Sequence, residues 1–151
     1  MLVLDPARET VSHSNVRDLA EQLKPGDLLM LNDTRVLPAR LRGRREGGGG
    51  AEVLLLRPLE TAHRWEALVR PGHRLPVGAQ ITFAGSPLIA AVEMKNGDIA
   101  TISLTGTAEP LAEVRRIGEM PTPPYIKEKL EDGERYQTVY SRREGSAAAP
   151  T

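Results

Sequence analysis

The chain has 151 residues, of which 40% are hydrophobic and 3% aromatic, so one small domain, or one with part of another, is built on an aliphatic core. Twenty basic and twenty acidic residues cancel, which excludes a global basic field and leaves only local patches to attract nucleic acid. The lack of cysteine excludes disulfides, thiolate metal sites and cysteine nucleophiles, and no apolar run approaches membrane-spanning length. We therefore expect a cytoplasmic protein that does not cross a membrane.

The N-terminal part predicts a β-hairpin, a short helix and a buried strand. The predicted elements are a strand over residues 1–5, a returning strand over 10–15 and a helix over 17–23. Asn15 can cap the helix, and Pro25 and Gly26 end it. Residues 28–31 are an unbroken apolar run, too short for a core helix, which predicts a strand buried on both faces.

A polar tetrad, Asn32, Asp33, Thr34 and Arg35, separates this run from the next apolar segment. Polar groups between buried segments must satisfy their own hydrogen bonds or meet a ligand. The tetrad could bind a ribose, a nucleobase edge or a carboxylate. The alternative is a self-capped turn, in which Asn32 and Asp33 bond nearby amides and Arg35 pairs with Asp33.

Arginines recur at every second position in Arg40, Arg42 and Arg44, so a strand here would place all three on one face. Such a row suits RNA phosphates, but a solvated strand face explains it equally well. The glycine run at 47–50 is expected to be a mobile hairpin tip rather than a phosphate cradle, because no lysine-bearing helix follows it.

The middle of the chain is a series of short strands, which predicts a small antiparallel barrel or sandwich. The predicted strands cover residues 51–56, 65–69, 80–83, 88–94 and 99–104. Asn96-Gly97 is the strongest hairpin signal. After this region we expect a helix over 109–117, a stiff proline-rich segment over 118–125 and a small, flexible segment over 145–151.

Isolated side chains add weaker signals. Tyr125, beside several prolines, could stack on a nucleobase or belong to a packed linker. Tyr136 and Tyr140 suit core or interface packing. The three histidines, His13, His63 and His73, lack metal-ligand spacing and are interpreted as non-catalytic, so no metal site is predicted. No GxGxxG motif indicates a dinucleotide fold.

Several motifs in one order resemble the S-adenosylmethionine:tRNA ribosyltransferase-isomerase family of queuosine biosynthesis. They are Leu2-Val3-Leu4-Asp5, Gly26-Asp27-Leu28-Leu29, Asn32-Asp33-Thr34-Arg35-Val36, Pro38-Ala39-Arg40-Leu41, Trp65 with Leu68-Val69 and Pro71-Gly72, Gly118-Glu119-Met120-Pro121, Pro123-Pro124-Tyr125-Ile126-Lys127, Glu134-Arg135-Tyr136-Gln137-Thr138-Val139-Tyr140 and Gly145-Ser146 with Ala148-Ala149-Pro150-Thr151. An ordered set of this kind is far more specific than a single motif.

The resemblance implies an α/β and mainly β protein, with a small antiparallel β-barrel lobe inserted in part of an α/β lobe. The expected division is residues 1–48 in the α/β lobe, 49–117 in the barrel and 118–151 in the returning α/β lobe. The implied reaction moves the ribosyl part of S-adenosylmethionine to 7-aminomethyl-7-deazaguanine at the tRNA wobble position. It gives epoxyqueuosine and releases adenine and methionine. The family resemblance further implies a monomer without a metal.

The same resemblance, joined to the chemistry of the tetrad, gives the predicted site. Asp33 and Arg35 are the expected catalytic residues, and Arg40, Arg42 and Arg44 the expected RNA contacts. The predicted substrate-binding residues are Asn32, Thr34, Tyr125, Tyr136, Gln137, Thr138, Ser146, Pro150 and Thr151. The competing hypothesis is a non-catalytic β-barrel module that binds RNA. Members of the family extend beyond both ends of this sequence, so we expect the 151-residue chain alone to be inactive.

Overall fold

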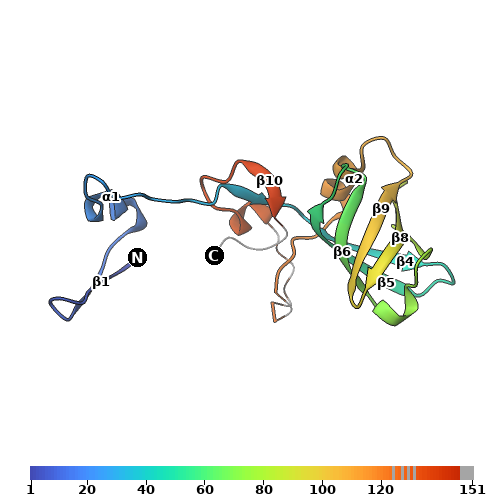
Figure 1. The fold of residues 1–151 in the computed structure, drawn as a ribbon, viewed down its shortest axis with the longest axis horizontal. Helices are drawn as coiled ribbons and strands as arrows, with labels where there is room; N and C mark the ends of the chain where they lie inside the picture. The colour runs from blue at the N-terminus through green and yellow to red at the C-terminus, as the bar shows by residue number, and fades with distance from the viewer. Residues whose placement is uncertain (124, 127, 129, 131, 147–151) are drawn as a thin grey trace. The chain divides into compact units, whose positions relative to one another are not determined.

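A computed structural model describes residues 1–123, 125, 126, 128, 130 and 132–146 (Figure 1). The chain divides into two compact units, residues 1–31 and residues 32–151. Each unit is described separately below.

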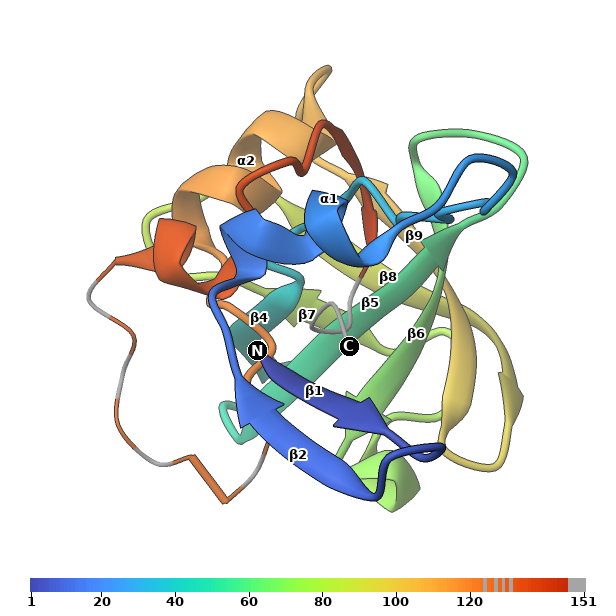
Figure 2. The same ribbon diagram turned by 90° about the vertical axis from the view of Figure 1, so that its left-hand side faces the viewer.

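The first unit is a hairpin followed by a short helical segment. Its elements are β1 (Leu2–Asp5), β2 (Thr10–His13), the 3-10 helix η1 (Val16–Asp18) and α1 (Leu19–Gln22). The two strands pair antiparallel with Leu2 opposite His13 (Figure 2). At the helix start, Asp18 Oδ2 accepts hydrogen bonds from Asn15 N and Ser14 Oγ, both at 2.9 Å. These bonds, that from the Asn15 main chain above all, hold the pKa of Asp18 below its usual value. The predicted hairpin and helix are confirmed.

The predicted buried strand at residues 28–31 is wrong. These residues form no strand, and the side chains of Leu28 and Met30 are 85% and 84% exposed. A strand buried on both faces requires neighbours on each side. No described strand pairs with this run, so its apolar pattern does not lead to burial here.

The second unit is dominated by a closed antiparallel barrel (Figure 1). Its strands are β4 (Arg40–Arg45), β5 (Gly50–Pro58), β6 (Arg64–Arg70), β7 (Gln80–Thr82), β8 (Ile89–Asn96) and β9 (Ile99–Thr105), in the closed order β4-β5-β6-β9-β8-β7. The five strands predicted between residues 51 and 104 are confirmed. β4 closes the barrel by pairing with both β5 and β7, and it lies before the range predicted for the barrel lobe.

The barrel core is aliphatic, as the composition predicts. The largest fully buried side chains within it include Leu41, Val53, Leu55, Val69, Ile81, Leu88, Ile102 and Leu104. Burial alternates along each strand, because successive side chains point to opposite faces. Trp65 is 5% exposed, and its indole Nε1 donates to Ala62 O at 2.9 Å, so its one polar atom is satisfied inside the core.

Glycines at the barrel turns behave as the sequence predicts. Gly47 and Gly48 have φ values of 85° and 86° at the tip of the β4–β5 hairpin, a region that other residues rarely adopt. Gly97, with φ of 63°, turns the chain between β8 and β9, where Asn96 lies opposite Ile99. The predicted hairpins at both places are confirmed.

Helix α2 (Pro110–Ile117) follows the barrel, close to the predicted range, and buries Val114 completely. Proline in the first turn of the helix removes no helical hydrogen bond, because a main-chain N–H at this position would have no partner within the helix. Beyond Gly118, the main chain of Glu119 exchanges two hydrogen bonds with Arg40, at 2.9 and 3.1 Å. These bonds attach the proline-rich segment to the start of β4. A further 3-10 helix, η2 (Gly72–Arg74), follows β6.

Strands from either side of the barrel sequence meet as a parallel pair, β3 (Thr34–Val36) with β10 (Arg143–Ser146). The barrel is therefore inserted between two segments that pair with each other. Between them, the 3-10 helix η3 (Gly133–Tyr136) precedes Gln137. The expectation of a flexible segment is wrong for residues 145 and 146, which lie in β10, while residues 147–151 lie outside the described residues.

The fold is mainly β with an antiparallel barrel, as predicted. None of the helices in the described parts of the chain is long and apolar enough to cross a membrane.

Candidate functional site around strand β3

The polar tetrad is anchored through the β3–β10 ladder. Arg142 N and Arg143 N both donate to Asp33 O, at 2.7 and 3.3 Å, and Arg143 lies opposite Thr34. The tetrad lies at the amino end of β3, because Asn32 and Asp33 come directly before the strand and Thr34 begins it. The ladder thus brings together two of the three segments predicted to form the site.

Gln137 supplies the third segment and closes the other side of β3. Its Oε1 accepts from Val36 N at 2.8 Å, and its Nε2 donates to Val36 O at 2.9 Å. Main-chain groups alternate between the two edges of a strand, so β10 takes one edge of β3 and this amide takes the other. One acceptor site and one donor of the Gln137 amide are therefore used on the main chain of β3, which fixes the orientation of this side chain.

Arg35 is held by residues far away in sequence rather than by Asp33. Its Nη2 pairs with Glu134 Oε1, and its Nη1 donates to Ser141 Oγ at 3.3 Å. The alternative in which Arg35 and Asp33 satisfy each other is therefore wrong. Glu134 and Gln137, three residues apart around η3, bind consecutive residues of β3.

The other side chains of the tetrad differ in what they bind. Asn32 Oδ1 accepts from Thr34 N at 2.9 Å and from Thr34 Oγ1, as in a self-capped turn. Asp33 is half-buried, and among the described residues its carboxylate has no hydrogen-bond or ion-pair partner. An unengaged carboxylate with part of its surface open to solvent can accept hydrogen bonds or a proton from a ligand.

The remaining predicted substrate-binding residues make few contacts that would show whether they belong to a site. Tyr125 is 79% exposed, which leaves its ring face accessible. Thr138 has a buried Oγ1 without a partner among the described residues, and Tyr136 is half-buried at the end of η3. Ser146 ends β10, but its side chain, Pro150 and Thr151 lie outside the described residues.

The arginine row lies on β4, on the face opposite the buried Leu41, as its spacing predicts. Its members are not equivalent. Arg40 Nη2 donates to Thr122 O at 3.0 Å, and Arg42 Nε donates to Glu119 Oε2 at 3.0 Å. Arg44 is exposed and has no side-chain partner among the described residues.

Helix α2 places two further arginines, Arg115 and Arg116, beside Arg40 and Arg42. The sequence had not marked these two residues as part of a site. Arg115 and Arg116 line a cavity of about 600 Å³ together with Arg40, Arg42 and Glu119. They are adjacent in the last turn of an ordinary amphipathic helix, so no local pattern marks them. Arg115 binds Glu144 of β10 through two nitrogens, with contacts of 2.9, 3.1 and 2.5 Å.

This ion pair ties the helix that follows the barrel to the β3–β10 ladder. Hydrogen bonding from Arg115 holds the pKa of the Glu144 carboxyl below its usual value, and the charge of Arg35 acts in the same direction. Glu134 and Glu144, the acids that fix the ladder, were also missed. Within the described residues, no group of three or more His, Cys, Asp or Glu side chains is placed to hold a metal ion.

Comparison with known proteins identifies the family of the chain. The model of the family described as queuosine biosynthesis protein matches residues 1–151, the whole chain. The chain belongs to the queuosine biosynthesis protein family. Similar curated proteins include the S-adenosylmethionine:tRNA ribosyltransferase-isomerase of Caldanaerobacter subterraneus subsp. tengcongensis, 45% identical over 154 residues. The protein of the same name from Symbiobacterium thermophilum is 48% identical over 155 residues.

Both matches cover 100% of this chain and 45% of the relative, so the chain spans about half the length of the curated relatives it matches. Among solved structures, an S-adenosylmethionine tRNA ribosyltransferase from Thermotoga maritima is similar, with 30% identity and a TM-score of 0.45. That match covers 83% of this chain and 44% of the other. The resemblance to the queuosine family that the motifs indicated is confirmed.

Proposed function

We propose that the full-length gene product is an S-adenosylmethionine:tRNA ribosyltransferase-isomerase. The observation that carries this proposal is the match of the entire chain to relatives of that name, at 45% and 48% identity. The ribosyl part of S-adenosylmethionine is moved to 7-aminomethyl-7-deazaguanine at the wobble position of a tRNA. The product is epoxyqueuosine, adenine and methionine are released, and the tRNA substrate places the enzyme in the cytoplasm.

The chemistry requires a proton acceptor and a rigid support. The sulfonium of the donor acidifies the adjacent C5′ proton, and its removal and the attack of a positioned amine must follow. Asp33 fits the first requirement, since its carboxylate is unengaged among the described residues and half-buried. It could equally accept hydrogen bonds from ribose hydroxyls. The support comes from main-chain bonds on both edges of β3.

The other predicted residues take narrower roles in this proposal. Arg35 and Gln137 hold β3 in place, and a methionine carboxylate would share the Arg35 guanidinium with Glu134 and Ser141. Asn32 and Thr34 shape the turn that presents Asp33. Tyr125, Tyr136 and Thr138, with Ser146, Pro150 and Thr151, are proposed to line the pocket, and Arg40, Arg42 and Arg44 to contact tRNA. The enzyme is proposed to act as a monomer without a metal.

The decisive experiment is adenine release from S-adenosylmethionine by the full-length gene product, with and without tRNA that carries the aminomethyl base. We expect release only when this tRNA is present. Well-folded protein that releases no adenine with competent tRNA would refute the transferase. If that protein nevertheless bound the tRNA, the non-catalytic RNA-binding module would be the better description.

Asp33→Asn tests the proposed site, because it keeps the shape and removes the charge. We expect adenine release to fall by about a hundredfold or more, the usual effect of removing a general base. Glu21→Gln, at an exposed position in α1, is the matched control and should retain full activity. An Asp33→Asn enzyme that folds, binds tRNA and keeps near-normal turnover would assign Asp33 a purely structural role.

A further inference from the structure

The barrel arginines fall into two groups, those that are neutralised by an acid and those that are not. The neutralised arginines and their acids are Arg57 with Glu66 at 2.8 Å, Arg64 with Glu93 at 2.9 Å and Arg42 with Glu119 at 3.0 Å, and a longer contact of 4.0 Å joins Arg40 and Glu52. Among the described residues, no carboxylate lies within ion-pair distance of Arg44, Arg45, Arg70 or Arg74. The chain is neutral overall, so this uneven distribution creates a local field.

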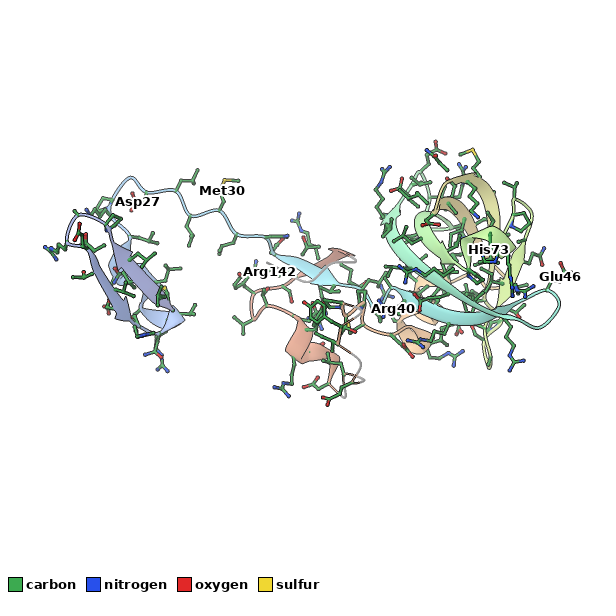
Figure 3. All side chains as sticks on the ribbon, turned by 90° about the horizontal axis from the view of Figure 1, so that it is seen from below. Asp27, Met30, Arg40, Glu46, His73 and Arg142 are labelled. Carbon is green, nitrogen blue, oxygen red and sulfur yellow. The ribbon has the colours of Figure 1, made fainter. Side chains whose placement is uncertain are left out.

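The unpaired arginines gather at one end of the barrel, which we call the basic end and define as Arg44, Arg45, Arg70, Arg74 and Lys95. β4 finishes at Arg45, β6 finishes at Arg70, and η2 follows directly with Arg74. Lys95, near the end of β8, donates to Gly72 O and, at 3.3 Å, to Leu75 O, which fixes an ammonium beside η2. In Figure 3, Glu46 marks the tip of the β4–β5 hairpin, at the far end of the barrel from Arg40.

Strand register makes a shallow groove beside these arginines. Arg42, Glu52 and Arg70 lie in one row across β4, β5 and β6. The groove, of about 580 Å³, is bordered by Arg42 and Arg70 and lined between them by Gly43, Gly50, Ala51 and the carboxylate-bearing Glu52. Three small residues keep part of the floor low, so an extended polyanion can approach the strands beside Arg70, whose guanidinium has no acidic partner among the described residues, whereas Arg42 on the other side is paired with Glu119.

Charge and shape both favour a nucleic-acid backbone as the occupant. Arg44, Arg70 and Arg74 are exposed, and each guanidinium offers planar donors that match phosphate oxygens. An open groove with the unpaired Arg70 on one side, and the unpaired Arg44 and Arg74 near it, suits a flexible chain of phosphates. The acids at this end, Glu46, Glu52 and Asp98, are outnumbered by the cations.

We propose that the basic end of the barrel binds the phosphodiester backbone of the substrate tRNA, with Arg44, Arg70 and Arg74 as the contacts. This inference rests on the proposed function for the identity of the RNA. The proposal places the main RNA contact at the end of β4 opposite Arg40. Arg40 and Arg42 are already bound to Thr122 and Glu119. At 3.3 Å per residue, Arg45 at that end lies about 16 Å along the strand from Arg40.

The test compares four variants of the full-length gene product, one of which, Arg40→Ala/Arg42→Ala, changes the other end of β4. Arg44→Gln/Arg70→Gln/Arg74→Gln removes the contacts, and the corresponding triple lysine variant keeps the charge. Arg8→Gln/Arg17→Gln/Arg57→Gln is the matched control, since it removes the same net charge from exposed positions elsewhere. The measurements are the affinity for tRNA as a function of salt concentration, the KM for tRNA and kcat at saturating tRNA.

For the triple glutamine variant we expect the slope of log affinity against log salt to become shallower by about two to three units. The KM for tRNA should rise about tenfold or more at 0.1 M salt, with kcat within about twofold of wild type. The lysine variant should keep most of the slope, and the control should match wild type.

An unchanged slope and KM in the triple glutamine variant would overturn the inference. So would a loss confined to an Arg40→Ala/Arg42→Ala enzyme, which would locate the contact at the other end of β4. Wild-type protein that binds tRNA without releasing adenine would refute the transferase alone. In that case the salt slopes would still decide whether the basic end binds RNA.

Discussion

The two hydrogen bonds between Gln137 and the main chain of Val36 allow a sharp test of how strand β3 is held. Gln137→Met keeps the length of the side chain and removes both bonds, of 2.8 and 2.9 Å. A net loss of about 0.5–1.5 kcal/mol per bond gives about 1–3 kcal/mol for the pair. Since each 1.4 kcal/mol is a factor of ten, protection of the Val36 amide against hydrogen exchange should fall by about tenfold to a hundredfold.

The assay is residue-resolved hydrogen exchange on the 151-residue chain. Gln80→Met, on an exposed position of β7, is the matched control and should leave exchange at β3 unchanged. Barrel amides should keep their protection in both variants, because the loss is confined to the β3–β10 ladder. Unchanged exchange at Val36 in Gln137→Met would show that the amide does not hold the strand.

A second variant, Gln137→Glu, adds a dependence on pH. As a carboxylate, Glu can still accept from Val36 N but faces Val36 O with an unfavourable charge, so it should weaken the ladder at pH 7. Protonation restores the missing donor, so the difference from wild type at the same pH should shrink as pH falls through the usual range for glutamate, about 4. A difference that stays constant from pH 7 to pH 4 would contradict this account.

Two further predictions concern stability. Hydrogen exchange in the 151-residue chain should protect residues 51–105 more than residues 1–4 or 141–146, because the closed barrel has no free edge, and uniform protection would be inconsistent with this. Ion pairing with Arg115 lowers the pKa of Glu144, so its contribution to stability is present above the unfolded pKa and is lost as pH falls through the lower folded value. The stabilities of Glu144→Gln and wild type against denaturation should therefore differ near pH 7 and converge only below the usual titration range of glutamate, and a gap that widened in acid would reverse the assigned sign.

The sequence by itself determined the barrel and the family. The alternation of apolar residues from 51 to 104, and glycines such as Gly97 where the chain must turn, are local signals, and each strand fits its neighbours through the same period of two. The ordered motifs pointed to the queuosine family without any knowledge of contacts. The apolar run at 28–31 was misleading, because periodicity reports what a segment could bury and not whether a neighbour is present.

Only the tertiary structure decided which polar groups are free. The sequence of the tetrad left open whether Arg35 pairs with Asp33 or meets a ligand, and the structure gives Arg35 the partners Glu134 and Ser141, about a hundred positions later. Gln137 was predicted to bind substrate, and the structure shows that its amide also binds the main chain of Val36 across a similar separation. Likewise, the even spacing of Arg40 and Arg44 could not show that one is engaged and the other exposed. Hydrogen bonds and ion pairs depend on distance in space, and a chain that inserts a barrel between β3 and β10 makes that distance independent of separation in sequence.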